Sequence, residues 1–304
     1  MSSPSVSVCM PVYNTKRYVA EAVESILAQT FGDFEFLIID DGSTDGSRAI
    51  LERYAKQDDR IRLISRPNTG IAGARNEALG LARGELIAVM DSDDVALPER
   101  FEVQVAYLRE HPECVVVGSR ALIIDPDGCA LTIMPEELTH EEIDSALMTA
   151  KGQIVYHSSI IFRARALAEV GPYGNEYNNF AEDLDLVLRL AEVGQITNLA
   201  EPLLKYREHP SKSSQVVQAV YQADAVHRAI AAAYRRRGLE VPEWLATATQ
   251  TRLSNLTERR RVWAWWALNS GRVATARKHA AACLIRSPLL SHSWRLLYCA
   301  LRGY

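Results

Sequence analysis

The sequence has 304 residues, of which 48% are hydrophobic and 24% charged, a composition suited to one large α/β domain with an appendage or to two domains. It has no basic segment before its short N-terminal apolar run and no apolar stretch near the roughly 18 residues of a transmembrane helix, so we expect a protein that is neither secreted nor membrane-spanning. The net charge is −4, but the charge is distributed unevenly. Residues 1–220 contain 20 Lys and Arg and 34 Asp and Glu, whereas residues 221–304 contain 14 Lys and Arg and 4 Asp and Glu. The acidic first region argues against nucleic acid as its partner. The five cysteines show no CxxC pair or metal-binding spacing, which favours reduced, cytosolic thiols.

The first 110 residues alternate between strand and helix patterns. Apolar runs predict strands over 6–12, 35–40, 61–65 and 85–90, and amphipathic stretches predict helices over 18–30, 47–57 and 71–84. This alternation predicts a parallel sheet with helices on both faces. Ligands of such sheets bind at the carboxyl ends of the strands, where the loops gather.

The following residues predict a mixed sheet and then an all-helical region. The expected elements are a helix from Pro98 to about Glu110, a strand over 114–125 with a hairpin turn at 126–128, a helix over 136–150, a strand over 155–164, a helix over 181–194 and a strand leading into a polar loop over 202–214. From Val216 onward, Ala- and Arg-rich helical patterns occur without strand candidates. We therefore expect a domain boundary near residue 215.

An acidic cluster follows the fourth predicted strand, where Asp91, Asp93 and Asp94 occupy three of four consecutive positions. Aspartates at i and i+2 of a tight loop can offer oxygen ligands to Mg²⁺ or Mn²⁺, which often complete their coordination with substrate phosphates. The alternative is a loop of solvated aspartates that caps the helix beginning at Pro98. The cluster thus predicts either a divalent cation with a diphosphate or a helix cap.

Polar residues also follow the first two predicted strands. Asp40 and Asp41 end the second strand, where a carboxylate can accept a hydrogen bond from a nucleobase. Tyr13, in the segment "PVYN" with Asn14, could stack on a base, although a lone tyrosine after a strand more often packs against the protein. Residues 44–47 suit a helix cap.

The segment "NTGIAGARN" places Arg75 and Asn76 at the start of a helix. Arg75 could contact nucleotide or phosphate groups, or remain an exposed helix arginine. The glycine spacing matches neither a Walker loop nor a dinucleotide-binding fingerprint.

Further candidates lie in the second half of this region. Glu182, Asp183 and Asp185 precede or occupy the first turn of an apolar helix, where capping suits at least one of them and another could act as a general base. His157, Arg207 and His209 individually suit structural or surface positions, but histidines near a metal and arginines near a diphosphate have evident functions.

Together these residues resemble the family 2 glycosyltransferases of GT-A fold. The resemblance covers residues 6 to about 214 and is carried, in the family's order, by "VSVCMPVYN", "SILAQTFGDFEFLIIDDGSTDGS", "NTGIAGARNEALGLARGELIAVMDSDD", "LPER", "HSSIIFR", "AEDLDLVLRLAEVG" and "PLLKYREHPSKSS". It implies a Rossmann-like, mostly parallel mixed sheet flanked by helices, with a nucleotide-binding half of about 1–110 and an acceptor half of about 111–215. The basic helical region 216–304 would follow as an extension.

The resemblance also implies an activity, which is the inverting transfer of a sugar from a nucleotide donor, usually UDP-linked, to an acceptor hydroxyl, with Mn²⁺ or Mg²⁺ as cofactor. Such a reaction would serve the assembly of polysaccharide, lipopolysaccharide or another glycoconjugate. By position, the resemblance implies that the base of the nucleotide is surrounded by Pro11, Tyr13, Asp40 and Asp41, that Arg75 supports the nucleotide, and that Asp91 faces the ribose. It implies that Asp93 binds the metal, that Asp183 is the catalytic base, and that His209 and Arg207 lie near the metal or the diphosphate. Further candidates are Asn14, Asn76, Asp94, His157 and Glu182.

Two other functions remain open. A sugar-nucleotide nucleotidyltransferase would need a basic, glycine-rich phosphate loop after the first strand, which "PVYNTKRY" does not resemble. A non-catalytic nucleotide-sugar-binding or scaffold protein is disfavoured by the presence of both "DSDD" and "AED".

The tail has arginine clusters at 235–237 and 259–261 that alternate with "VWAWWAL" and "WRLLYCAL". Such helices suit the interface of an anionic membrane, where a lipid-linked saccharide acceptor would lie. They suit equally a bundle that packs on the catalytic domain or on a second subunit. The expected location is the cytoplasm, with the inner face of the plasma membrane as the place of contact in the first case.

Overall fold

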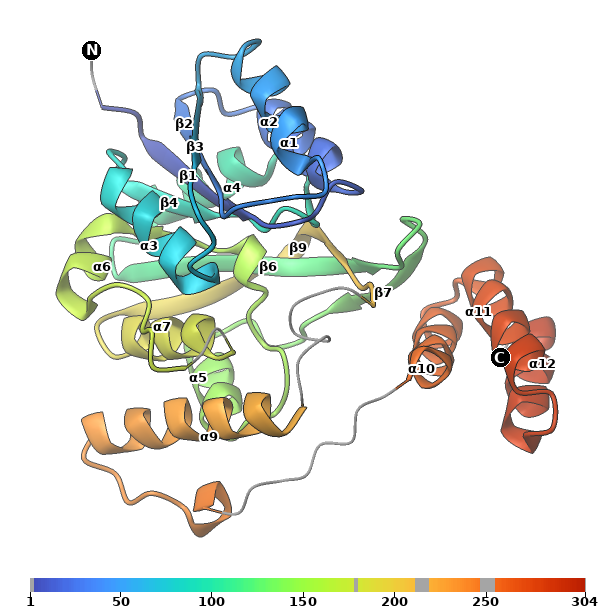
Figure 1. Cartoon of the computed structure of the whole chain (residues 1–304). Helices are drawn as coiled ribbons and strands as arrows, with labels where there is room; N and C mark the ends of the chain where they lie inside the picture. Colours follow the sequence, from blue (N-terminus) through green and yellow to red (C-terminus); the bar gives the residue numbers. More distant parts are fainter. Residues whose placement is uncertain (1–2, 178–179, 211–218, 247–254, 304) are drawn as a thin grey trace.

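The centre of the molecule is a mixed β-sheet, shown in Figure 1 in a computed structural model that describes residues 3–177, 180–210, 219–246 and 255–303. Its strands are β1 (Val6–Val12), β2 (Phe34–Asp40), β3 (Ile61–Ser65), β4 (Leu86–Val89), β5 (Val95–Ala96), β6 (Cys114–Ile124), β7 (Ala130–Met134), β8 (Ile161–Arg163) and β9 (Gln195–Arg207). They form one nine-stranded sheet in the order β3-β2-β1-β4-β8-β6-β9-β5, with β7 paired to β6.

The first four major strands are parallel, as predicted. β1 lies between β2 and β4, and β3 pairs with the outer side of β2. Val12 pairs with Asp40, and Asp40 with Ser65, so these strands end at one edge of the sheet. That common edge brings together the loops that carry the candidate site residues.

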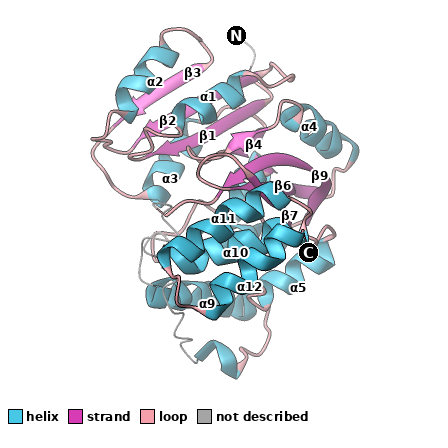
Figure 2. Ribbon diagram, turned by 90° about the vertical axis from the view of Figure 1, so that its right-hand side faces the viewer, coloured by secondary structure: helices cyan, strands magenta, loops and turns pink. Residues whose placement is uncertain are grey.

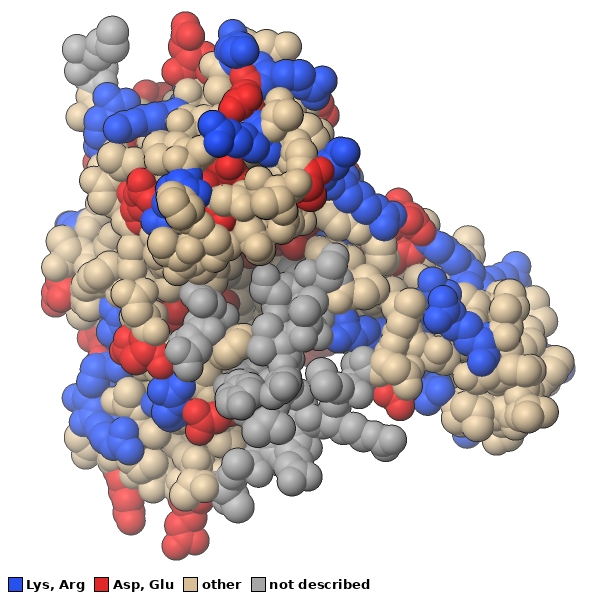
Figure 3. Space-filling model, viewed as in Figure 1, with Lys and Arg blue, Asp and Glu red and all other residues tan. Residues whose placement is uncertain are grey.

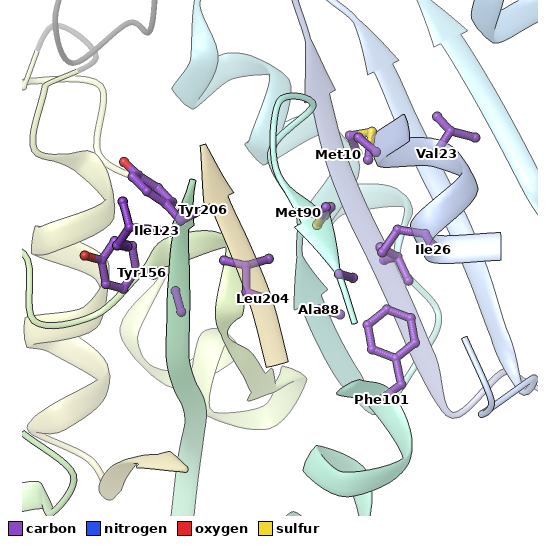
Figure 4. Packing of buried hydrophobic residues seen from close by; sticks show 14 of the residues in the cluster. Met10, Val23, Ile26, Ala88, Met90, Phe101, Ile123, Tyr156, Leu204 and Tyr206 are labelled. Carbon is purple, nitrogen blue, oxygen red and sulfur yellow. The ribbon is translucent and has the colours of Figure 1, made fainter. Parts of the chain in front are cut away.

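Helices cover both faces of the sheet because successive side chains of each buried strand point in opposite directions. On one face, Met10 and Phe36 pack with α1 (Val19–Leu27), α2 (Ser47–Ala55) and α4 (Arg100–Glu110). Figure 4 shows the close packing of Met10, Met90 and Phe101 on this face. On the other face, Cys9 and Leu37 pack with α3 (Ile71–Leu81), α5 (His140–Met148), α6 (Ala164–Val170) and α7 (Glu182–Ala191). The predicted two-sided covering is confirmed.

The second half of the sheet is mixed. β8 is antiparallel to β4 and β6, β9 is parallel to β6 and antiparallel to β5, and β6 and β7 form the predicted hairpin. The strand predicted over 155–164 is wrong in its first part, because residues 157–159 form a 3-10 turn. The hydroxyl of Ser159 donates to the carbonyl of Tyr156 over 2.7 Å, a local bond that competes with strand pairing.

The helical region beyond residue 218 packs in two different places. α9 (Ala219–Arg236) lies against α5 and α7, where Arg236 pairs with Glu192, and Arg237 with Asp144. α10 (Leu256–Asn269), α11 (Val273–Arg286) and α12 (Ser291–Arg302) form a helical layer beside β7 (Figure 2). The predicted boundary near residue 215 lies in the segment 211–218, outside the described residues. Of the helices that the structure describes, none combines the length and apolarity needed to cross a bilayer.

Asp125, directly after β6, joins the β6–β7 hairpin to the helical layer. Its Oδ2 accepts from Lys278 Nζ at 2.5 Å and lies 3.0 Å from His279 Nε2, while Oδ1 accepts from the backbone N–H groups of Asp127 and Cys129. Burial alone would raise the pKa of this carboxyl, but His279, Lys278 and the backbone donors outweigh burial and hold the pKa well below its usual range. The carboxylate is therefore ionised and fully engaged.

Replacement of Asp125 tests this connection. We expect Asp125→Ala to lower the free energy of unfolding by roughly 3 kcal/mol, because the hairpin and α11 both lose a buried acceptor. Asp127→Ala is the matched control, since this side chain pairs with the same Lys278 but is 58% exposed, and its loss should be below ~1 kcal/mol. Urea denaturation measures both changes; equal losses would contradict the assigned role of Asp125.

Candidate active site

A cavity of about 630 Å³ lies at the carboxyl ends of the parallel strands. Its lining includes nine residues that the sequence analysis singled out, which are Pro11, Tyr13, Asp41, Arg75, Asp91, Asp93, His157, Glu182 and Asp183. The other seven, Asn14, Asp40, Asn76, Asp94, Asp185, Arg207 and His209, are not part of the lining. Both predicted halves of the chain thus contribute to one cavity.

The loop after β1 presents an aromatic side chain at the cavity. Tyr13 is 52% exposed, although it follows a fully buried strand. Asn14 beside it has a positive φ of 52° and accepts a hydrogen bond from the backbone N–H of Thr44 at 2.8 Å, which ties this loop to the one after β2. The tyrosine ring is therefore held at the surface of the cavity, where a flat ligand ring could stack on it.

The two acids at the end of β2 organise neighbouring loops. Asp41 accepts from Arg66 Nε at 3.0 Å and from the backbone N–H groups of Thr69 and Gly70 at 3.0 and 2.9 Å, so it shapes the loop between β3 and α3. Asp40 is buried and accepts from the backbone N–H of Ser43 at 3.1 Å. Asp41 faces the cavity, whereas Asp40 supports the turn behind it.

Arg75 is buried and connects the two halves of the site. Its guanidinium donates to Asp91 Oδ1 at 3.0 Å and to Glu182 Oε1 at 2.8 Å, and it lies 5.5 Å from the centroid of the Tyr173 ring. Burial lowers the pKa of Arg75, but the two carboxylates outweigh burial and raise it overall. The interpretation of Arg75 as an exposed helix arginine is therefore wrong.

The three acids after β4 occupy different environments. Asp91 lines the cavity and pairs with Arg75, and Asp93 lines the cavity with its Oδ2 2.9 Å from His209 Nε2. Asp94 is fully buried and accepts from the backbone N–H of Arg207 at 2.9 Å. α4 begins at Arg100 without a side-chain cap, so the alternative of an acidic helix cap is not what the structure shows.

Arg207 and His209 hold the acidic loop from behind. Arg207 Nε donates to the carbonyl of Asp93 at 3.0 Å, and its guanidinium pairs with Glu21 at 2.6 Å. The imidazole of His209 packs against the ring of Tyr18 at 4.8 Å between centroids. Both side chains are buried and fix the position of Asp93.

The donor groups around Asp93 are compatible with a divalent cation. Its carboxylate supplies the hard oxygen that suits Mg²⁺ or Mn²⁺, and the imidazole of His209 is a common metal ligand. Five carboxylates but a single guanidinium line the cavity within the described chain, which leaves an excess of negative charge there. No group of three or more His, Cys, Asp or Glu side chains suited to a metal occurs among the described residues, so a cation would need further ligands from a substrate.

A neutral histidine forms part of the opposite wall. His157 Nε2 lies 2.7 Å from the hydroxyl of Tyr173, and burial together with the nearby Arg75 lowers the pKa of His157 to about 4. Asn76 forms hydrogen bonds of 2.9 Å with both the backbone N–H and the carbonyl of Tyr173. Asn76 therefore positions Tyr173, which in turn orients the imidazole.

Two adjacent carboxylates lie at the start of α7. Glu182 is buried against Arg75, whereas Asp183 accepts a hydrogen bond from the N–H of Leu184 at 2.8 Å. Burial and the neighbouring Asp183 raise the pKa of Glu182 to about 7, because they outweigh the attraction of Arg75. Neither residue caps α7 through its side chain, and Asp185 instead pairs with Arg189.

Sequence reasoning missed Arg66 and Tyr173. Each acts through another residue, since Arg66 holds Asp41 and Tyr173 contacts both His157 and Arg75. Arg66 lies directly after a predicted strand, a position that could have drawn attention to it. The segment "GPYGN" around Tyr173 carries no comparable signal.

Known proteins resemble this chain in sequence and in fold. The model of the family "Glycosyl transferase family 2" matches residues 7–171. The putative glycosyltransferase EpsE of Bacillus subtilis is 39% identical over 212 residues, which cover 68% of this chain and 74% of EpsE.

Two solved structures share the fold. S. aureus TarS 1–349 in complex with UDP-GlcNAc has a TM-score of 0.62 at 20% identity, covering 98% of this chain and 89% of that one. The mannosyltransferase PcManGT from Pyrobaculum calidifontis, in complex with GDP-Man and Mn²⁺, has a TM-score of 0.57 at 20% identity, covering 100% of this chain and 82% of that one. The predicted GT-A fold is thereby confirmed, and the family match with the identity to EpsE shows that the chain belongs to glycosyl transferase family 2.

Proposed function

We propose that this glycosyltransferase moves a sugar from a UDP-linked donor to an acceptor hydroxyl with inversion at the anomeric carbon. The observation that carries the proposal is one cavity that joins an exposed aromatic ring, Tyr13, and the acids Asp91 and Asp93 to the carboxylate of Asp183. The first three come from the nucleotide-binding half and the last from the acceptor half. A donor and an acceptor can therefore meet between them.

The donor's nucleotide would lie along the ends of β1 and β2. Tyr13 and Pro11 offer a surface for the base, Asp41 an acceptor for its N–H groups, and Asp91 an acceptor for a ribose hydroxyl. Asp40 and Asn14 support these loops, and Arg75 holds Asp91 in place. The complexes of TarS with UDP-GlcNAc and of PcManGT with GDP-Man have the same fold and support a nucleotide sugar as the donor.

A diphosphate is strongly anionic, and the acidic lining would repel it without a cation. Asp93, with His209 behind it, would hold Mn²⁺ or Mg²⁺. When bound, such an ion neutralises charge on the leaving diphosphate. The Mn²⁺ in the PcManGT complex supports this cofactor.

Asp183 is the proposed catalytic base. It accepts the proton of the acceptor hydroxyl while that oxygen forms a bond to the anomeric carbon and the bond from this carbon to the diphosphate oxygen breaks. Attack from the face opposite the leaving group inverts the configuration, and no covalent intermediate is needed. Glu182 is less suited to this task because Arg75 binds it in the wall of the cavity.

The acceptor would occupy the part of the cavity formed by the second half of the chain. Its lining is mostly apolar, with Phe180, Leu184 and Val187 beside the polar groups of Gln153 and Tyr206. Such a surface suits the apolar faces and polar edges of sugar rings. We propose a carbohydrate or a lipid-linked saccharide as acceptor, in the assembly of a cell-envelope polysaccharide or glycoconjugate. We also propose a cytoplasmic location.

Donor binding can be tested by thermal unfolding. UDP with Mn²⁺ should raise the Tm by about 5 °C at concentrations about 100-fold above Kd, and GDP with Mn²⁺ should raise it less. Asp93→Ala should abolish the rise, because it removes the proposed metal ligand. Asp59→Ala, at an exposed position outside the cavity, is the control and should retain it. A full rise with Asp93→Ala would refute the assignment of the metal site.

The base can be tested by transfer assays with a panel of UDP-sugars and saccharide acceptors. Asp183→Asn should reduce kcat by about 10²- to 10⁴-fold, because the amide cannot accept the proton. The same variant should keep the Tm rise with UDP and Mn²⁺, which separates catalysis from binding. Full transfer activity in Asp183→Asn would favour a different base.

The raised pKa of Glu182 predicts a pH-dependent stability. Between its ordinary value of 4.5 and about 7, Glu182 is neutral in the folded protein but ionised in the unfolded chain, so stability falls as the pH rises through this window. Glu182→Gln cannot ionise, and its stability relative to the wild type should therefore increase from about pH 5 to about pH 8. Urea denaturation at both pH values measures the difference; a constant difference would contradict the raised pKa.

A further inference from the structure

Exposed apolar side chains concentrate at the C-terminal end of the chain. Among the described residues, eleven large hydrophobic side chains are exposed, and six of them lie between residues 285 and 301. These six, which we call the α12 face, are Ile285, Leu289, Leu290, Trp294, Tyr298 and Leu301, with exposed fractions of 44% to 96%. Such a concentration marks an interaction surface.

α12 has two distinct sides. Ser293, Leu296 and Ala300 are buried against the other helices of the layer. Trp294, Tyr298 and Leu301 recur at helical spacing on a different side and remain more than half exposed. One side of α12 therefore packs against its own bundle, and a second, apolar side faces outward.

The charge around this surface has one sign. Residues 259–304 contain nine Lys and Arg and no Asp or Glu. Arg286, Arg295 and Arg302 are exposed beside the α12 face, and the guanidinium of Arg302 lies 4.8 Å from the centroid of the Tyr298 ring. Within the described chain, neither Arg286 nor Arg295 forms an ion pair. Figure 3 shows Lys and Arg side chains across the helical layer next to an extended uncharged area.

Two arginines of the cluster at 235–237 form ion pairs instead. Arg236 pairs with Glu192 and Arg237 with Asp144 on the catalytic body, although Arg236 and the neighbouring Arg235 stay exposed. Trp263, in the segment "VWAWWAL", is 2% exposed and belongs to the core of the helical layer. Among the described residues, more than half of the exposed large apolar side chains lie in the last part of the tail, next to the exposed Arg286 and Arg295.

We propose that the α12 face binds an anionic lipid bilayer, with its apolar side chains in the interfacial region and Arg286, Arg295 and Arg302 near the lipid phosphates. Trp and Tyr suit this position because their rings are apolar and their N–H and O–H groups are polar. The arginines add electrostatic attraction to an anionic surface. This binding does not depend on the proposed reaction.

A second copy of the chain fits the same surface less well. Two-fold association through α12 would bring each α12 face against its own equivalent. The arginines beside it would then approach one another without an acidic residue in 259–304 to balance them. An anionic bilayer supplies the opposite charge that a second copy lacks.

Vesicle flotation with the full chain tests the proposal. The protein should float with vesicles of phosphatidylcholine and phosphatidylglycerol, remain unbound with phosphatidylcholine alone, and dissociate at high salt. Trp294→Ser combined with Tyr298→Ser and Leu301→Ser should weaken binding at least tenfold. Arg286→Gln combined with Arg295→Gln should weaken it about fivefold for each arginine.

Matched controls alter similar side chains elsewhere. Leu239→Ser removes an exposed apolar side chain, and Arg53→Gln with Arg62→Gln removes two exposed arginines, all outside the helical layer. These variants should bind vesicles like the wild type. The Tm rise with UDP and Mn²⁺, or circular dichroism if that rise is absent in the wild type, verifies that each variant is folded.

Three results would overturn the proposal. The first is equal vesicle binding by the wild type and the triple serine variant. The second is the absence of any preference for anionic over neutral vesicles. The third is a wild-type protein that does not bind vesicles and is a dimer in sedimentation equilibrium, while the triple serine variant is a monomer. This result would assign the α12 face to self-association.

Discussion

The buried guanidinium of Arg75 is the constraint on which the site depends. It is 3% exposed and must find carboxylates, because an unpaired charge in the interior is strongly unfavourable. Asp91 comes from the loop after β4 and Glu182 from the start of α7, and both reach the same side chain. One ion-pair network therefore fixes the distance between the acidic loop after β4 and the start of α7, where the proposed donor and acceptor sites would meet.

The same network gives two neighbouring carboxylates different properties. Glu182 is buried, pairs with Arg75 and has a pKa of about 7, so its proton occupancy changes near neutrality. Asp183 lines the cavity one residue further along, with one oxygen bound to the N–H of Leu184. The start of α7 thus places a buried, paired acid directly before one that lines the cavity.

Much of the fold followed from the sequence because its signals are local. The four parallel strands and their helices have clear periodicities, and most of the candidate site residues follow strands that end at one edge. The features that the sequence did not predict depend on ion pairs between residues far apart in the chain. Arg75 is buried in an ion pair with Glu182, which is 107 positions away, and Arg236 pairs with Glu192 across 44 positions. No periodicity distinguishes Arg236 from Arg295, for which the described chain offers no ion pair.

The contacts of Asp125 with Lys278 and His279 also connect the helical layer to the cavity. Asp125 follows Ile124, which pairs with Arg207, and Arg207 in turn holds the acidic loop at Asp93. The carboxylate of Asp125 also accepts a hydrogen bond from Lys278 of α11, and α12 packs against α11. The outer helix and the acidic loop are therefore connected through one short run of strand. In the proposed contact of α12 with a bilayer, this connection would hold the cavity, and with it the proposed base Asp183, at a set height above the lipid.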